Sequence, residues 1–392
     1  MHSLRRFLPI LVGIPLLLAV IASTAWNLGN TQADWGLLPD DPDIALSAAI
    51  NDFRSAGRLP APGTLTAVTA AAGLDPLEEE PLAFATLSDA GIEPAEAIAL
   101  LKEARRRNPA SSEVRLLLLD RYLRADYMAG AIGEIGALTS LQPEGRKQLS
   151  QLLLGLVAAP ETRHSAIAAL RQSPIRKPLI AELAQVGASS FLLLDLARDL
   201  TGIEPDSEDA RWTQRVTQAL VQQGDLPGAH RLWRHFFNVP AGGSNRRVFD
   251  GAFAGLAAPP FGWEFPSGSS GHSERESGGL RVRYDGRDPM ILARQVLLLP
   301  PGRYRLDHKI TATEGPLPNL AWRIDCIAPR KTLLDLSLAE TFTFERNQSP
   351  DFSVPAQGCA GQSLSLVGRS LPVPSMRSAL VSKVDVVGGS TR

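Results

Sequence analysis

The feature that most constrains the fold is an internal repetition of apolar positions. Residues 95–109 read AEAIALLKEARRRNP, a run in which small and large apolar residues recur every three or four positions, as on the buried face of a helix. A shift of 34 residues superimposes positions of the same kind: Ala97 on Ala131, Leu101 on Ile135, Ala104 on Leu138 and Pro109 on Pro143. Because a helical unit that repeats in this way buries its apolar face against its neighbours, the sequence predicts a stacked helical array.

Helical periodicity extends from about Asp43 to Asn238. The block 81–143 resembles tetratricopeptide repeats; the first helix and the turn of its second unit lie in SEVRLLLLDRYLRADYMAGAI. A second run, QALVQQGDLPGAHRLWRHFFNVP at 218–240, resembles them as well. In the latter, the resemblance assigns the turn to Gly224-Asp225, the small residue to Ala229, the large residue to Trp233 and the stop to Pro240. It implies a helical repeat domain over 43–240, with about four to six hairpins and a groove that binds protein partners of the cell envelope. The alternative is that these helices only hold the C-terminal domain away from the membrane.

The N-terminus carries an uncharged apolar segment, FLPILVGIPLLLAVIASTAW, at residues 7–26. About twenty such residues span a membrane as a helix. Arg5 and Arg6 precede the segment and no Lys or Arg follows before Arg54, so the positive-inside rule places the N-terminus in the cytoplasm. We therefore expect a cytoplasmic tail (1–6), a single-pass membrane anchor (7–26), a linker (27–42) and a remainder on the far side of the membrane. The alternative is a signal peptide cleaved near Ala25, which would also export the chain.

The sequence pattern changes after Pro240. We expect a linker at 241–246 and an antiparallel β-sandwich, a jelly roll, at 247–392, because short alternating runs are separated there by turn residues. The run LAWRIDCIA, for example, places Leu320, Trp322, Ile324 and Cys326 on one face. The run QVLLLPPGRYRLDHKI, residues 295–310, resembles the strand–turn–strand of galactose-binding-like carbohydrate-binding modules. The polar run SGSSGHSERESGG at 267–279 is typical of a loop.

The aromatic stretch VFDGAFAGLAAPPFGWEF, residues 248–265, is expected to open the sandwich with short strands that seal it against the last helices. Farther along, PAQGCAGQSLSL at 355–366 contains Cys359 and Gln362. With the anchor and the irregular repeats, these runs resemble exported proteins of polysaccharide-secretion and exosortase-type loci in Gram-negative bacteria. The resemblance covers nearly the whole chain. It implies that the anchor lies in the bacterial inner membrane and that the bulk of the chain is periplasmic. It also implies a role in polysaccharide biosynthesis or export and assigns no reaction to any residue.

The cysteine count agrees with export. The chain has two cysteines, Cys326 and Cys359, and an oxidising compartment permits a disulfide between them. The alternative is two unrelated buried cysteines.

No residue pattern indicates catalysis. The six histidines do not form a metal-binding motif, and neither a Walker loop nor a G-x-G-x-x-G run is present. We therefore predict a non-enzymatic protein without cofactor or metal, and the net charge of −1 gives nucleic acid no electrostatic attraction. The alternative to a protein-binding scaffold is a glycan-binding sandwich on a helical stalk. In that case Trp263 and Tyr304 are the candidate rings for stacking on sugars.

Overall fold

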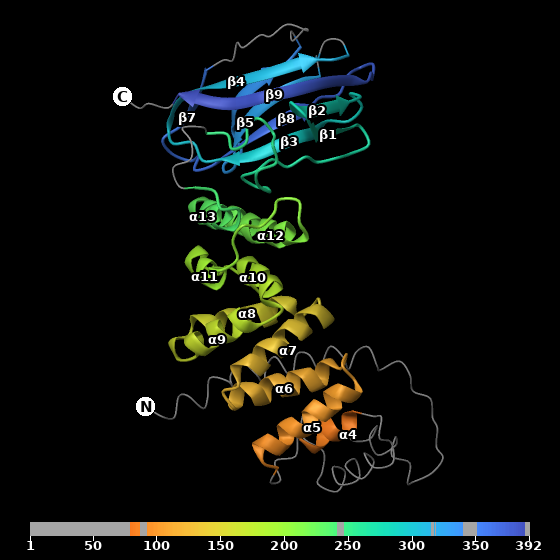
Figure 1. Cartoon of the computed structure of the whole chain (residues 1–392), viewed down its shortest axis with the longest axis vertical. Coiled ribbons are helices and arrows are strands. Elements are labelled where there is room, and N and C mark those ends of the chain that lie inside the picture. Colours follow the sequence, from red (N-terminus) through yellow and green to blue (C-terminus); the bar gives the residue numbers. More distant parts are fainter. Residues whose placement is uncertain are drawn as a thin grey trace, which may run out of the picture. The chain divides into compact units, whose positions relative to one another are not determined.

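The structure is a computed structural model that describes residues 79–86, 92–240, 247–314, 317, 319–339 and 351–388. Within these residues helices come first and strands follow (Figure 1). The chain divides into two compact units, Met1–Val186 and Gly187–Arg392. The described helices of the first unit are α4 (Glu80–Ala85), α5 (Pro94–Arg107), α6 (Ser112–Arg124), α7 (Met128–Leu141), α8 (Arg146–Ala158), α9 (Pro160–Gln172) and α10 (Arg176–Gln185). The second unit holds α11 (Ser190–Leu196), α12 (Glu208–Gln222), α13 (Leu226–Phe236) and the described strands.

The predicted repetition is present in the first unit. Helices α5 and α7 begin and end 34 residues apart, at Pro94 and Met128 and at Arg107 and Leu141. The superimposed apolar positions are all at most 3% exposed: Ala97, Leu101, Ala104, Ala131, Ile135 and Leu138. Each small residue allows a neighbouring helix to approach, and each large one fills the space between helices. The array therefore forms as the sequence predicts, by burial of the apolar face of each repeated helix against its neighbours.

A buried ion cluster joins three helices of the first unit. The carboxylate of Glu134, on α7, is 2% exposed and accepts hydrogen bonds from Arg105 of α5 and Arg115 of α6. The Arg115 guanidinium also donates to the carbonyl oxygen of Pro109, at 2.8 and 2.6 Å. A buried carboxylate is tolerated only when charged partners satisfy it, so this cluster fixes α5, α6 and α7 against one another.

In the second unit the helix pair α12–α13 has the local features that the sequence indicates. Gly224 turns the chain with a φ of 85°, and the Asp225 side chain caps α13 by accepting from the Gly228 N–H at 2.9 Å. Ala229 and Trp233 are buried. Trp233, however, packs on the aromatic stretch that precedes the strands, with its ring centroid 4.8 Å from that of Phe249. Helices α11 to α13, which the sequence assigns to the repeat domain, therefore share a compact unit with the sheets.

The strands form two antiparallel sheets, as predicted. One has the order β1-β2-β9-β4-β7 and the other β3-β8-β5-β6. Their bounds are β1 Gly271–Glu276, β2 Gly279–Tyr284, β3 Met290–Leu297, β4 Gly302–Ala312, β5 Leu320–Cys326, β6 Thr332–Ser337, β7 Asp351–Val354, β8 Gln362–Gly368 and β9 Arg377–Gly388. Alternate residues of both sheets meet in one apolar core that includes Leu306 of β4, Trp322 of β5 and Val384 of β9. The core makes the pair of sheets a sandwich.

Two predicted elements of this region differ in the structure. The stretch 248–265 forms turns and a single bridge from Glu264 to Arg294 instead of two strands. Asp250 and Phe253 adopt positive φ there, and the Asp250 carboxylate accepts three backbone N–H groups, which fixes a turn. The predicted loop at 267–279 contains β1, whose polar side chains suit an edge strand that has one face in water.

Several predicted segments lie outside the described residues. They are the tail at 1–6, the anchor at 7–26, the linkers at 27–42 and 241–246, the first part of the repeat domain and parts of the sandwich domain, residues 340–350 among them. Among the residues that the structure describes, no helix is long and apolar enough to cross a membrane.

Candidate functional site

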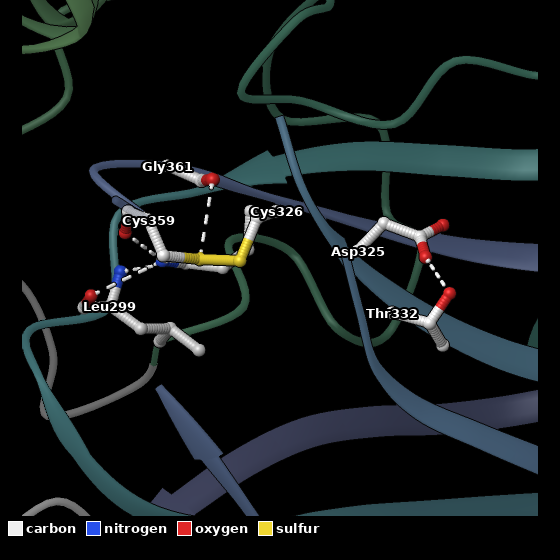
Figure 2. Close-up of a disulfide and its surroundings, with 7 residues drawn as sticks. Leu299, Asp325, Cys326, Thr332, Cys359 and Gly361 are labelled. Carbon is white, nitrogen blue, oxygen red and sulfur yellow. Dashed lines mark hydrogen bonds between the residues drawn. A yellow bond between two sulfur atoms is a disulfide. The ribbon is translucent and has the colours of Figure 1, made fainter. Parts of the chain in front are cut away.

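The predicted disulfide is present, and it fixes one end of the sandwich (Figure 2). Cys326 at the end of β5 is bonded to Cys359, and both residues are buried. Gln362 holds the same region, because its amide nitrogen donates to the Cys359 carbonyl oxygen at 2.9 Å and its amide oxygen accepts from the Leu299 N–H at 2.8 Å. A methyl group added at Gly361 would lie 2.6 Å from the Leu226 side chain. The disulfide loop is therefore also the surface on which α13 begins.

The two rings proposed to stack on sugars lie in the core. Trp263 and Tyr304 are each 2% exposed. The Trp263 indole N–H donates to the Asp250 carbonyl oxygen at 3.0 Å, and the Tyr304 hydroxyl donates to the Pro300 carbonyl oxygen at 2.6 Å. Neither ring offers a face to a ligand, and in this structure both have a packing role. Alternation along a strand indicates which side chains share a face, and here that face is the interior.

A surface cleft of about 390 Å³ lies at one edge of the sandwich, between the segment 264–270 and the start of β3. On one side the Arg294 guanidinium donates two parallel hydrogen bonds to the Glu264 carboxylate, at 2.6 and 2.9 Å. Backbone hydrogen bonds of 2.9 Å in both directions hold these two residues opposite each other. The side chains are 41% and 29% exposed, and hydrogen bonding to Glu264 raises the pKa of Arg294, which keeps it charged.

Short polar groups also line the cleft. The Ser270 hydroxyl donates to the Asp288 carboxylate at 3.2 Å, and the Asp288 N–H donates back to that hydroxyl at 3.3 Å. Reciprocal backbone hydrogen bonds between Gly268 and Gly271 close the turn that precedes β1. Met290 is an apolar residue of the lining. The arrangement can exchange hydrogen bonds with a small polar ligand.

A row of polar side chains continues from the cleft across the outer face of the four-stranded sheet. Strand register places Arg294 opposite Ser365, Ser365 opposite Arg323, and Arg323 opposite Asp335. Each arginine of this region has a carboxylate partner: Arg294 pairs with Glu264, Arg323 with Asp325, and Arg369 with Asp335. The strand aromatics Tyr284, Tyr304, Trp322 and Phe352 are all buried. Hydrogen bonds, and not ring stacking, are what this face can offer.

Two histidines of the second unit are held in environments that favour the neutral ring. Burial, aided by the charge of Arg234, lowers the pKa of His230 on α13. Burial in the sandwich lowers the pKa of His308 on β4, and the nearby Asp307 carboxylate opposes that shift only in part. In the described part of the chain, no three His, Cys, Asp or Glu side chains group closely enough to hold a metal ion.

The sequence did not single out the residues of the cleft. Glu264 and Arg294 lie 30 positions apart, and only the folded backbone places them opposite each other. The available signals were local ones: Glu264 follows the buried Trp263, and Arg294 occupies an outward position of an alternating strand. Ser270 and Asp288 lie in turn-rich segments that gave no such signal.

Comparison with known proteins gives similarities to solved structures. No protein-family model matches the chain, and no curated protein matches it. A family 16 carbohydrate-binding module is similar at 15% identity, with 36% of this chain and 99% of that chain covered and a TM-score of 0.28. The N-terminal cellulose-binding domain of Cellulomonas fimi β-1,4-glucanase C is similar at 19% identity, with 37% and 97% covered and a TM-score of 0.26. YrrB, a tetratricopeptide-repeat protein with an unusual peptide-binding site, is similar at 12% identity, with 45% and 93% covered and a TM-score of 0.21.

Proposed function

We propose that this chain is a non-enzymatic scaffold of the bacterial cell envelope, anchored in the inner membrane by residues 7–26. Its helical array binds a partner protein in the periplasm, in the service of polysaccharide biosynthesis or export. The observation that supports this most is the repetition of α5 by α7, because an array of such units leaves one side of its helices free for a partner.

The side of the array that is left to a partner includes the polar face of α6. There Asp120 and Arg124 form an ion pair at 2.8 Å with side chains 25% and 47% exposed, and Leu123 beside them is partly exposed. An exposed pair of this kind contributes little to stability, about 0.3–0.5 kcal/mol, so it can be reversed without unfolding the helix. That property makes it a suitable place to test binding.

The test is affinity capture from solubilised envelopes with the full chain and with a charge-reversed variant, Asp120→Lys with Arg124→Glu. We expect a defined partner to be retained by the wild type and lost by the variant. An alkaline phosphatase fusion to the C-terminus should be active if the bulk of the chain is periplasmic. A partner retained equally by both forms would refute binding at α6, and an inactive fusion would refute export.

A second candidate function is glycan binding by the sandwich, and a specific observation favours it. The edge cleft presents a carboxylate, a guanidinium and serine hydroxyls around a space of about 390 Å³. Groups of this kind fix the orientation of hydroxyl-bearing ligands. Retardation of the chain in gels containing soluble polysaccharide tests this function, and unchanged mobility in every polysaccharide would contradict it.

A further inference from the structure

We propose that the edge cleft beside Glu264 and Arg294 binds a neutral sugar unit of a polysaccharide through hydrogen bonds alone. This inference rests on the second candidate function, glycan binding by the sandwich. It adds the place of binding, the residues that recognise the ligand and the chemical class of the ligand.

The charge of the cleft and of the row beside it selects a neutral ligand. The arginines there, Arg294, Arg323 and Arg369, are each neutralised by a carboxylate. Asp288 adds a further carboxylate, which also lines the cleft. An anionic ligand such as a uronate would meet the negative charges of the Glu264 and Asp288 carboxylates, and the single guanidinium of Arg294 offsets them only in part. A neutral ligand meets no such repulsion.

The Glu264–Arg294 pair is suited to neighbouring hydroxyl groups. A guanidinium has five N–H donors, and Arg294 uses its Nε and one Nη2 donor on Glu264. The remaining donors point away from the carboxylate, while each carboxylate oxygen can accept a further hydrogen bond. Two adjacent hydroxyls can therefore accept from Arg294 and donate to Glu264 without breaking the pair. Hydrogen bonds to charged groups are stronger than those between neutral groups. Such a site can therefore bind a sugar without an aromatic ring.

The polar row gives the ligand a direction in which to extend. Neighbouring strands lie about 4.8 Å apart, so Arg294, Ser365 and Arg323 follow one another across the sheet at that interval. Ser365 is only 5% exposed, so an oligosaccharide that starts in the cleft and runs across the strands meets Arg294 of β3 and then Arg323 of β5. A chain of several units is therefore expected to bind more tightly than a single sugar.

Titration of the full chain in detergent with neutral and acidic oligosaccharides tests the inference. The probes are cellopentaose, maltopentaose, a β-1,4-galactan oligosaccharide and an oligogalacturonate. Saturation-transfer NMR detects their binding, because this method is sensitive to weak complexes. The informative variant is Arg294→Lys, which keeps the positive charge and removes the bidentate hydrogen bonding of the guanidinium to the Glu264 carboxylate. Its matched control is Arg281→Lys, because Arg281 makes an equivalent pair with Glu276, at 2.6 and 2.6 Å, on the other sheet.

A third variant guards against an effect on folding. A Cβ at Gly268 would lie 3.5 Å from the Met290 side chain, which lines the cleft, so Gly268→Leu is expected to obstruct the cleft without touching Arg294. We expect at least one neutral oligosaccharide to bind, with affinity lowered tenfold or more by Arg294→Lys and by Gly268→Leu and unchanged by Arg281→Lys.

The contrary outcomes are distinguishable. Three outcomes overturn the inference while leaving glycan binding intact: binding that survives both cleft variants, binding that is lost equally in Arg281→Lys, and binding that favours the oligogalacturonate. Binding of no oligosaccharide overturns the inference and the second candidate function together.

Discussion

Replacing Trp233 should destabilise the sandwich as well as the helix that carries this residue. The side chain is 1% exposed, and its indole N–H donates to the Ala258 carbonyl oxygen at 2.6 Å. Phe249 and Phe261 pack on the ring, with centroids 4.8 and 5.6 Å away. All three of these partners belong to the stretch between α13 and β1. If that stretch transmits the packing, then helix and sheets unfold together.

The magnitude follows from the contacts that are lost. Truncation of a buried Trp to Ala costs about 3–5 kcal/mol, so Trp233→Ala should remove much of the stability of the second unit. Trp233→Phe keeps an aromatic ring but removes one of the two hydrogen bonds that the Ala258 carbonyl oxygen accepts, the other coming from the Gly262 N–H. The cost is about 0.5–1.5 kcal/mol in addition to the lost volume. Trp212→Phe on α12 is the matched control, because Trp212 is buried while its indole N–H has no hydrogen-bond partner. The difference between the two Phe variants isolates the hydrogen bond.

Urea unfolding followed by tryptophan fluorescence measures the effect on the sandwich. The described tryptophans, Trp212, Trp233, Trp263 and Trp322, all lie in the second unit, and the last two lie in the sandwich core. Trp26 and Trp35 are replaced by Phe throughout so that they do not contribute to the emission. We expect Trp233→Ala to lower the transition midpoint of the remaining emission, which comes from Trp212 of α12 and from Trp263 and Trp322 of the sandwich core. An unchanged midpoint, with helical circular dichroism lost earlier, would show that α13 unfolds independently of the sheets.

Three other perturbations have defined outcomes. Glu134→Gln leaves two arginines facing an uncharged group and should destabilise the first unit by roughly 3 kcal/mol, measured as unfolding followed by far-ultraviolet circular dichroism. The control is Glu103→Gln, at a more exposed carboxylate. Equal destabilisation by both variants would contradict a special role for the buried cluster. Replacing Cys326 and Cys359 together by Ala should cost roughly 3–4 kcal/mol from the loop that their 33-residue separation closes, and thiol labelling of the native chain that finds free thiols would contradict the disulfide. Burial lowers the pKa of His308 below its ordinary 6.5, so the unfolded chain takes up the proton first and stability should fall as the pH drops below that value. His308→Gln should flatten the dependence of stability on pH between about pH 7 and pH 5. The control is His272→Gln on the exposed edge strand. If only this control reduced the slope, His308 would not be the group responsible.

The helices could be predicted because their signal is local. Ala97, Leu101 and Ala104 and their partners 34 residues later each occupy one helix face, and the observed helices α5 and α7 keep that spacing. The inward faces of β4 and β5 could be predicted for the same reason, since alternation assigns Leu306 and Trp322 to the core. Periodicity along a single element is enough for predictions of this kind.

The remaining features depend on contacts that periodicity does not encode. The stretch 248–265 has aromatic residues at every second position from Phe261 to Phe265, which favours a strand, yet the Asp250 carboxylate accepts hydrogen bonds from three backbone N–H groups and imposes turns. Trp233 has the position of a repeat residue, but its neighbours come from that stretch. The cleft joins Glu264 to Arg294 across 30 positions. The first outcome is set by the side chain of one residue a few positions away, and the other two are set by tertiary pairing.

Site-specific photocrosslinking in living cells tests the central claim, that the helical array binds an envelope protein, most directly. A photoreactive amino acid is placed at Leu123 or Arg124 on the free side of α6 and, as a control, at Arg303 on the exposed side of β4. We expect one discrete cross-linked product from both α6 positions and none from Arg303. The absence of any product from α6, or the same product from all three positions, would contradict it.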